Sequence, residues 1–368
     1  MTNVAPDISI LTPVWNGLPY IRECVASVLS QDFQNWEMII GDNASDDGTS
    51  EYLRTINDPR IKVYRHKRNL GVYRNIRFLY NKATAPIYTA LCADDYFYPG
   101  GLRKIVREWE KAGKEVGLIS FNWRGRQMRH DALTVLSYSA LPRKLDHTNA
   151  AIAFFLFGNI PGNFSEVSAR VPLVVSEDFV YEIKYSGDYE YWLRLAEKTS
   201  IHLTDAEVVY IRRHDRVMAT YAIAKGEYHE ESIAVLEKVI EKLSEKCDRK
   251  KLIAFYNMNQ CAYHLRDAIK SALFGKFTAL QSFIKLKSGI FWPFQFIRVL
   301  PFALSERLRY AMVVPLARNI MIEYGLTGQT KSSDDYILEG KAHLLLNSER
   351  QDFADVASVL KAKDYLNK

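Results

Sequence analysis

The chain has 368 residues, of which 48% are hydrophobic and 25% charged, with a formal net charge of +6. This is ordinary globular composition, and the length allows a full α/β domain plus a second unit of about 100 to 150 residues. No segment offers about 18 uninterrupted apolar residues, so we expect no membrane-spanning helix.

The first 125 residues alternate short β-rich runs with amphipathic helical patterns. We expect strands at residues 8–15, 36–40, 61–64, within 83–95, and at 116–121. We expect helices between them, at 21–29, after the Ser45 to Asp47 start signals, around 76–82, and from Pro99 through 109. This βαβα rhythm predicts a parallel or mixed doubly wound sheet.

The pattern changes twice further along the chain. Residues 124–146 show no clean period, and we interpret them as a loop. An apolar helix is expected at 150–157, a helix at 187–197, and a strand at 207–211. Beyond about Lys225 the sequence predicts long helices rich in Lys, Glu and Leu, and therefore a separate C-terminal helical unit.

The cysteines are four in number and scattered, without a CxxC pair. The first residues show no basic, then apolar, then small-residue export signal. We therefore expect a reducing, cytosolic compartment.

Two adjacent carboxylates, Asp94 and Asp95, end an apolar strand pattern. Open α/β sheets bind ligands beyond the carboxyl ends of their strands, and paired carboxylates there suit Mg²⁺ or Mn²⁺. The pattern predicts a metal-bound phosphate ligand. The structural alternative is a capping motif before the helix that starts near Pro99.

The order of motifs resembles the inverting, nucleotide-sugar-dependent glycosyltransferases of family 2, whose fold is called GT-A. The resemblance covers roughly residues 6–220. Its pieces, in chain order, are ILTPVWNG at 10–17, SVLSQDF at 27–33, IIGDNASDDGT at 39–49, NLG at 69–71, Arg74-Asn75, and ADD at 93–95.

The resemblance implies roles in nucleotide binding for five residues. Thr12, Pro13 and Asn16 would line the nucleotide pocket, Asp42 would meet the base, and Arg74 would flank the nucleotide. The structural alternative for the Asp42 region is a turn followed by a helix cap, because Asp, Asn and Ser favour both in any protein.

The resemblance also implies that Asp94 approaches the ribose and that Asp95 binds the metal. A metal shared with a diphosphate would neutralise charge that grows as the sugar leaves. Many family members carry a third acid two residues before the pair, where this chain has Cys92. Since hard metals prefer oxygen, we expect Cys92 to pack in the strand and the metal to depend on fewer carboxylates.

A second constellation surrounds Asp188, at the expected start of a helix. The resemblance implies that Asp188 is the catalytic base, with Gly187 where another acid is common. Inverting transfer needs one carboxylate to take the acceptor proton. The alternative is an ordinary N-cap aspartate. We expect Trp192, Leu193 and Leu195 to be core, and leave Tyr189 open between core and substrate contact.

A third constellation follows the strand at 207–211, where Arg212, Arg213 and His214 end it with cationic and imidazole groups. Such groups suit a diphosphate site. The resemblance implies that His214 is a metal or phosphate ligand, and the alternative is a surface histidine. One of the two arginines is expected to assist, and the sequence does not distinguish them.

The C-terminal region holds the positive excess of the chain. From residue 264 to 320 there are nine Lys or Arg against two Asp or Glu, interleaved with many aromatic residues. This pattern is typical of a surface that binds anionic lipid. The alternatives are helical core with solvated lysines and a nucleic-acid surface, for which no motif is present.

Together these features predict a GT-A domain at 1–222, with a nucleotide-sugar half to about 125 and an acceptor half after it, followed by a helical region at 223–368. The expected function is a metal-dependent hexosyl- or deoxyhexosyltransferase. It would move sugar from a UDP- or dTDP-type donor to a glycan or lipid-linked glycan acceptor in cell-surface polysaccharide synthesis, as a peripheral protein at the cytoplasmic face of a bacterial membrane.

Two other functions were weighed. A non-catalytic nucleotide-sugar-binding or scaffolding domain is favoured only by Cys92, and retention of Asp42, Asp94, Asp95 and Asp188 argues against it. A dinucleotide oxidoreductase would need a GxGxxG turn after the first strand, and residues 13–17 do not form one.

Overall fold

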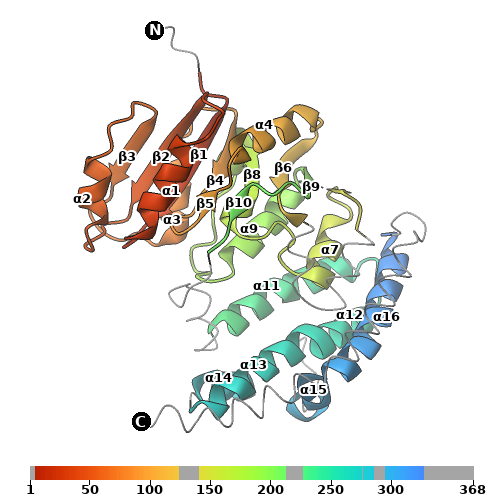
Figure 1. Cartoon of the computed structure of the whole chain (residues 1–368). Helices are drawn as coiled ribbons and strands as arrows, with labels where there is room; N and C mark the ends of the chain where they lie inside the picture. The colour runs from red at the N-terminus through yellow and green to blue at the C-terminus, as the bar shows by residue number, and fades with distance from the viewer. Residues whose placement is uncertain (1–4, 124–140, 213–226, 276, 286–294, 327–368) are drawn as a thin grey trace.

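A computed structural model describes residues 5–123, 141–212, 227–275, 277–285 and 295–326 (Figure 1). Its centre is an eight-stranded sheet of order β3-β2-β1-β4-β8-β6-β9-β7. The strands are β1 (Ile8–Val14), β2 (Trp36–Asp42), β3 (Ile61–Arg65), β4 (Ile87–Ala90), β6 (Val116–Ser120), β7 (Lys144–Leu145), β8 (Val167–Arg170) and β9 (Ser200–Leu203).

The first four strands form the parallel half of this sheet. β1 lies between β2 and β4 and is parallel to both, and β3 completes the edge. The other half is mixed, because β8 runs antiparallel between β4 and β6. The prediction of a mixed α/β sheet is confirmed. The sequence analysis missed β7, β8 and β9, which are short and sit between longer helical patterns.

Helices cover both faces of the sheet. A hydrophobic core lies on each face of the sheet, and alternate residues of β1 and β2 point into each. Ile8, Ile10, Met38 and Ile40 lie in one core, and Leu11 and Ile39 lie in the other. α1 (Tyr20–Leu29) and α4 (Gly101–Lys111) pack in the first core, and α3 (Val72–Tyr80) packs in the second. A strand buried on both faces explains the near-continuous apolar runs in the sequence.

A small second sheet differs from the prediction. The run within residues 83–95 is a strand only at β4, which ends at Ala90, so the two acids lie in the turn beyond it. β5 (Tyr96–Phe97) follows and pairs antiparallel with β10 (Val209–Tyr210). The strand expected at 207–211 is therefore a two-residue element that folds back beside the acidic turn.

The remaining helices of the α/β region are α2 (Thr49–Arg54), α7 (Ala150–Phe157), α8 (Val171–Val175) and α9 (Gly187–Ala196), with a 3-10 turn η1 (Phe164–Glu166). The bounds of α7 and α9 agree closely with the prediction. Trp192 and Leu195 are fully buried in the core, as expected.

The C-terminal region is helical, as predicted. It comprises α11 (Glu227–Leu243), α12 (Arg249–Tyr256), a π-helical turn η2 (Asn257–Cys261), α13 (Ala262–Leu273), α14 (Thr278–Lys285), α15 (Gln295–Leu304) and α16 (Glu306–Tyr324). Within the described residues, no helix is long and apolar enough to cross a membrane.

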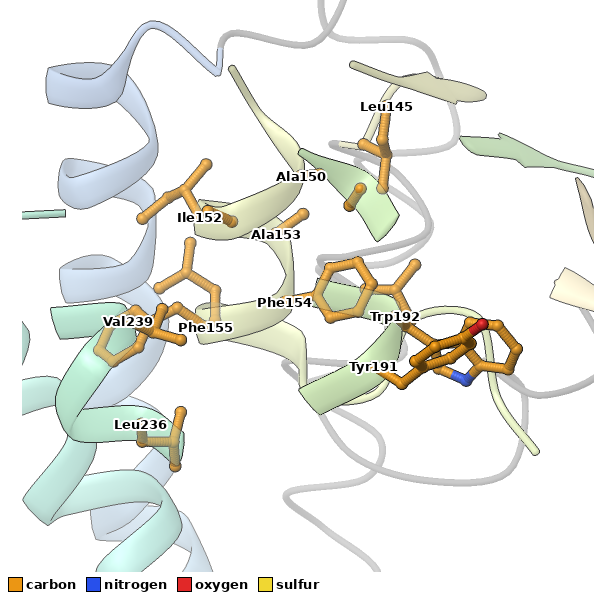
Figure 2. Close-up of a cluster of buried hydrophobic side chains, with 14 of the residues drawn as sticks. Leu145, Ala150, Ile152, Ala153, Phe154, Phe155, Tyr191, Trp192, Leu236 and Val239 are labelled. Atoms are coloured by element: carbon orange, nitrogen blue, oxygen red, sulfur yellow. The ribbon is translucent and has the colours of Figure 1, made fainter. Parts of the chain in front are cut away.

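The α/β region and the C-terminal helices share one core. α7 is apolar on all sides, and seven of its eight residues are buried. Figure 2 shows Phe154 of α7 on the side of Tyr191 and Trp192 of α9, while Phe155 lies on the side of Leu236 and Val239 of α11. A helix buried all round needs partners on every face, which explains this central position.

Candidate functional site

The loops that follow β1 and β2 are held together through Asn16. Its side chain donates to Asp46 Oδ1 at 2.8 Å and accepts from the Asp46 backbone N–H at 3.0 Å. Its backbone N–H donates to Ser45 Oγ, and its φ of 50° lies in the left-handed region that Asn tolerates. Asn16, predicted to line the nucleotide pocket, therefore shapes the rim of the sheet by joining two loops.

A neighbouring asparagine, Asn43, joins the β2 loop to the turn before α3. It donates to Asn69 Oδ1 at 2.8 Å and accepts from the Leu70 N–H at 2.8 Å. These bonds join the motifs at 39–49 and 69–71 in the structure. This link could not be predicted from the sequence, because a side-chain bond between distant loops leaves no periodic signal.

Asp42 ends β2 and is almost completely buried, with 1% of its surface exposed. Its carboxylate accepts from the Ser45 N–H at 3.0 Å and from the Ser50 hydroxyl, and Arg65 lies 3.4 Å away. The contacts of Asp42 with Ser45 and Ser50 are those of a turn, as the structural alternative predicted. The contact of Asp42 with the nucleobase stays a prediction.

Around β1, Thr12 is fully buried and Pro13 is partly buried. Trp15, which directly follows the strand, is 58% exposed. A large indole left in solvent next to loops that are otherwise well bonded is a candidate contact for a flat ligand. The sequence analysis missed this residue, although an aromatic residue immediately after the first strand could have drawn attention to it.

Arg74 lies exposed in the first turn of α3. Its guanidinium stacks over the Tyr181 ring, 4.2 Å from the centroid. Because the ring lies against the face of the guanidinium, the N–H groups at its edge are the donors that would bind an anion.

The acidic turn beyond β4 brings Cys92, Asp94 and Asp95 together, with one potential ligand atom of each within 4.8 Å of the others. Asp95 is buried, and burial together with the neighbouring charge of Asp94 raises the pKa of Asp95 to about 7. Two carboxylates held this close favour a bound cation, because it relieves both the burial of charge and their mutual repulsion.

Cys92 differs from its acidic neighbours. Burial, and then the charges of Asp95 and Asp94, raise the pKa of its thiol well above the usual value, so the thiol stays protonated. Its backbone N–H donates to Ser165 Oγ at 2.8 Å. A protonated thiol is a poor ligand for a hard metal, so the oxygen atoms of Asp94 and Asp95 are the donors that fit Mg²⁺ or Mn²⁺.

Arg212 closes the acidic turn from the side of β10. Its backbone N–H donates to Asp95 Oδ1 at 2.9 Å, and its Nε donates to the Asp94 carbonyl at 2.9 Å. The guanidinium also pairs with Glu23 of α1. Of the two arginines left open by the sequence, Arg212 thus lies beside the acids, whereas Arg213 and His214 lie outside the described residues.

Asp188 occupies the first turn of α9. Its carboxylate accepts from Asn159 Nδ2 at 3.0 Å and from the Tyr189 N–H at 2.8 Å. Burial raises the pKa of Asp188 to about 6, although both hydrogen bonds favour the charged form. A carboxylate poised near neutral pH is suited to take a proton, which an ordinary exposed cap would not be.

Tyr189, which the sequence left open, donates its hydroxyl to the Phe154 carbonyl at 3.1 Å. This contact joins α9 to α7, and the side chain is partly buried against the core. The packing role is the one the structure supports for Tyr189.

The two acidic positions are joined by η1. Ser165 contacts both Cys92 and Asp95, and the adjacent Phe164 ring packs against Tyr73 with centroids 6.3 Å apart. Tyr73 in turn accepts from the Gly187 N–H at 3.0 Å, next to Asp188. The acidic turn and the α9 terminus therefore belong to one connected site.

This arrangement, a mixed α/β sheet with acids placed beyond its strand ends, is the one that the resemblance to GT-A glycosyltransferases predicts. A comparison with family models agrees with this prediction. Residues 9–166 match the family model described as glycosyl transferase family 2, the family that the order of motifs resembles.

Individual relatives are distant. The chain is 24% identical over 217 residues to an uncharacterized glycosyltransferase of Rickettsia felis, a match covering 57% of this chain and 34% of that one. It is 44% identical over 73 residues to the Bacillus subtilis glycosyltransferase TuaG, assigned to teichuronic acid biosynthesis, covering 19% and 29% of the two chains. The matches thus span about a third of the length of these relatives.

A solved structure shares the fold over most of the chain. It is a mannosyltransferase of Pyrobaculum calidifontis in complex with GDP-mannose and Mn²⁺, with a TM-score of 0.50 and 15% identity, covering 88% of this chain and 87% of that one. At this identity the likeness concerns the fold.

Proposed function

We propose that the protein is an inverting glycosyltransferase that uses a UDP- or dTDP-sugar and a divalent metal to extend a cell-surface glycan. The observation that carries the proposal is the pair of acidic positions joined through η1, with Asp95 and Asp188 both buried enough to raise their pKa, to about 7 and about 6 respectively. The match to the family model and the likeness to the teichuronic acid glycosyltransferase support the reaction class and the kind of product.

The donor would lie over the loops after β1, β2 and β4. Trp15 offers an exposed indole on which a nucleobase can stack, and Arg74 offers a guanidinium edge to the nucleotide. Asp42 is the proposed partner of the base. Because its carboxylate already accepts two hydrogen bonds, it would bind the base only through a remaining lone pair.

A divalent metal would be held by Asp95 together with Asp94, the latter also near the ribose. When bound, it neutralises negative charge on the diphosphate as the sugar leaves. The Pyrobaculum mannosyltransferase, with its Mn²⁺, is consistent with this assignment. Arg212 holds Asp95 in place through its backbone N–H, and His214 stays a proposed further ligand.

Asp188 would be the general base. The acceptor hydroxyl oxygen forms a bond to the anomeric carbon while the bond from that carbon to the diphosphate oxygen breaks, and the hydroxyl proton passes to Asp188. Attack from the face opposite the leaving group inverts the configuration. Asn159 orients the carboxylate by donating to Oδ2.

We also propose that the C-terminal helices lie against the cytoplasmic face of a membrane, where a lipid-linked acceptor would be presented. The feature that supports membrane binding by these helices is a set of bulky apolar side chains, each more than half exposed. Among the described residues these are Leu273, Phe274, Phe277, Ile284, Ile297, Leu304 and Ile322. Combined with the basic excess of residues 264–320, they favour binding to anionic lipid.

The domain division follows the same proposal: a catalytic region at 1–222 and a membrane-facing region at 223–368, sharing the core around α7.

A thermal-shift screen of nucleotides and nucleotide sugars, with and without Mn²⁺, tests the proposal. A ligand that binds only the native state raises its apparent stability by mass action. We expect stabilisation by one nucleotide diphosphate and its sugars that requires Mn²⁺. Absence of stabilisation by every UDP, dTDP and GDP compound would contradict it.

A further inference from the structure

The start of α9, which carries Asp188, lacks a cap of its own. Ser186 occupies the N-cap position, but its hydroxyl makes no capping hydrogen bond. Instead this hydroxyl lies 3.1 Å from the hydroxyl of Ser232 in α11, and both serines are buried. The segment that leads into α9 is held by groups from other elements, because free N–H groups at a buried position are costly.

Glu231 of α11 supplies most of that support. Its carboxylate accepts from three successive backbone N–H groups: Lys184 at 2.8 Å, Tyr185 at 2.7 Å and Ser186 at 3.1 Å. The next N–H, of Gly187, donates to Tyr73 Oη. Four consecutive amides ahead of Asp188 thus have acceptors on other elements, three of them on a single carboxylate.

The Glu231 carboxylate lies in a partly buried place and accepts through both of its oxygens. Hydrogen bonds to a charged acceptor are stronger and more directional than those between neutral groups. Glu231 belongs to the C-terminal helical region, about 40 residues beyond Asp188 in the sequence. The contact therefore couples that region to the backbone that aims the proposed base.

We propose that Glu231, assisted by Ser232, is a positioning residue that fixes the start of α9 and thereby holds Asp188 in line with the acceptor hydroxyl. The inference rests on the proposed role of Asp188. It gives the C-terminal helices a function in turnover that is separate from any contact with a membrane. Small displacements of a reacting group, about 1 Å, can cost on the order of 100-fold in rate.

The test compares four full-length variants: Glu231→Gln, Ser232→Ala, Asp188→Asn, and the control Glu241→Gln, which changes an exposed glutamate of the same helix. Glutamine keeps the length of the side chain but loses the charge and one acceptor oxygen. Two readouts are taken: hydrogen exchange of the amides at 184–186, and the separate values of kcat and donor Kd.

We expect Glu231→Gln to speed exchange at 184–186 and to lower kcat tenfold or more, on the order expected for a misplaced catalytic group, with donor Kd unchanged. Ser232→Ala should do the same to a smaller extent, and Glu241→Gln should change neither. If Glu231→Gln speeds exchange without lowering kcat, or does not change exchange, the inference is overturned. In either case Asp188→Asn still tests the proposed base independently. Full activity of Asp188→Asn would overturn the proposed function and the inference together.

Discussion

The hydroxyl of Tyr73 accepts a hydrogen bond from the backbone N–H of Gly187 at 3.0 Å, and the Tyr73 ring fills the space where a side chain at position 187 would lie. A Cβ added to Gly187 would come within 2.7 Å of two ring carbons. This contact accounts for the glycine beside Asp188.

Gly187→Ala should therefore displace either the Tyr73 ring or the first turn of α9. Overpacking of this kind costs about 1 to 3 kcal/mol of stability, and here it also moves Asp188. We expect a lower Tm and a lower kcat. Tyr73→Phe is the matched comparison, since it keeps the ring and loses only the acceptor, at about 1 kcal/mol. A Gly187→Ala protein with parental Tm and kcat would show that the ring yields freely.

The acidic turn predicts a metal requirement for donor binding. Asp95→Ala and Asp94→Ala should weaken Mn²⁺-dependent nucleotide binding, because each removes a carboxylate from a site where Cys92 cannot replace it. Calorimetry with UDP and dTDP measures the effect. Asp32→Ala, which removes an exposed carboxylate paired with Arg103, is the control and should bind as the parent does. Equal metal-dependent binding in all three variants would contradict the assignment of the metal site to Asp94 and Asp95.

The pKa of Asp188 sets a pH dependence. Its value of about 6 is raised from the ordinary one, and the base acts only when deprotonated, so kcat should rise with pH through about 6 and then level off. The Asn159 hydrogen bond favours the charged carboxylate. Asn159→Ala should therefore move this rise to higher pH. The pH profile of kcat at saturating donor measures it, and a shift to lower pH would contradict the assignment.

Trp15 gives a prediction specific to the nucleotide. Trp15→Ala should weaken nucleotide binding by about 1 to 3 kcal/mol, the range for stacking of a base on an aromatic ring. Trp15→Phe should retain part of the affinity. Titration of UDP and dTDP by calorimetry compares the three proteins. If the alanine variant binds as tightly as the parent, the exposed indole has another role.

Membrane binding is tested with the exposed apolar side chains. Near an anionic surface each cation contributes about 1 kcal/mol, and screening acts over a Debye length of about 10 Å at 0.1 M salt. The protein should sediment with anionic vesicles, less so as salt rises. Phe274→Asp combined with Ile297→Asp should reduce sedimentation, because both side chains are exposed, Phe274 at the end of α13 and Ile297 in α15. Equal binding to anionic and neutral vesicles would contradict the proposal.

The sequence predicted the parallel half of the fold because its strands are continuous apolar runs flanked by helical periods. It missed β8, whose four residues Val167–Arg170 pair with β4 and β6 in the opposite direction. A strand this short is defined by its neighbours in space and leaves no pattern of its own. The run ending in Asp94 and Asp95 was read as one strand, whereas β4 stops at Ala90 and a turn presents the acids.

The site residues were predicted in a similar way. Acids at strand and helix ends could be predicted, because a residue that follows a strand pattern or starts a helical pattern lies at the edge of the sheet. Asn159 and Glu231 were not found, since each acts on Asp188 or its backbone from a distant element. Contacts of this kind depend on the packing of α7 and α11, which a single sequence does not specify.

The proposed mechanism requires that Asp188 take the acceptor proton in glycosyl transfer. The most direct measurement is release of nucleoside diphosphate by the parent and by Asp188→Asn, using the donor found by thermal shift and a lipid-linked glycan acceptor. Asn keeps the shape of the side chain and cannot accept the proton, so we predict a loss of kcat on the order of 100-fold or more, with donor Kd unchanged. An Asp188→Asn protein that binds the donor and transfers sugar at the parental rate would contradict the account.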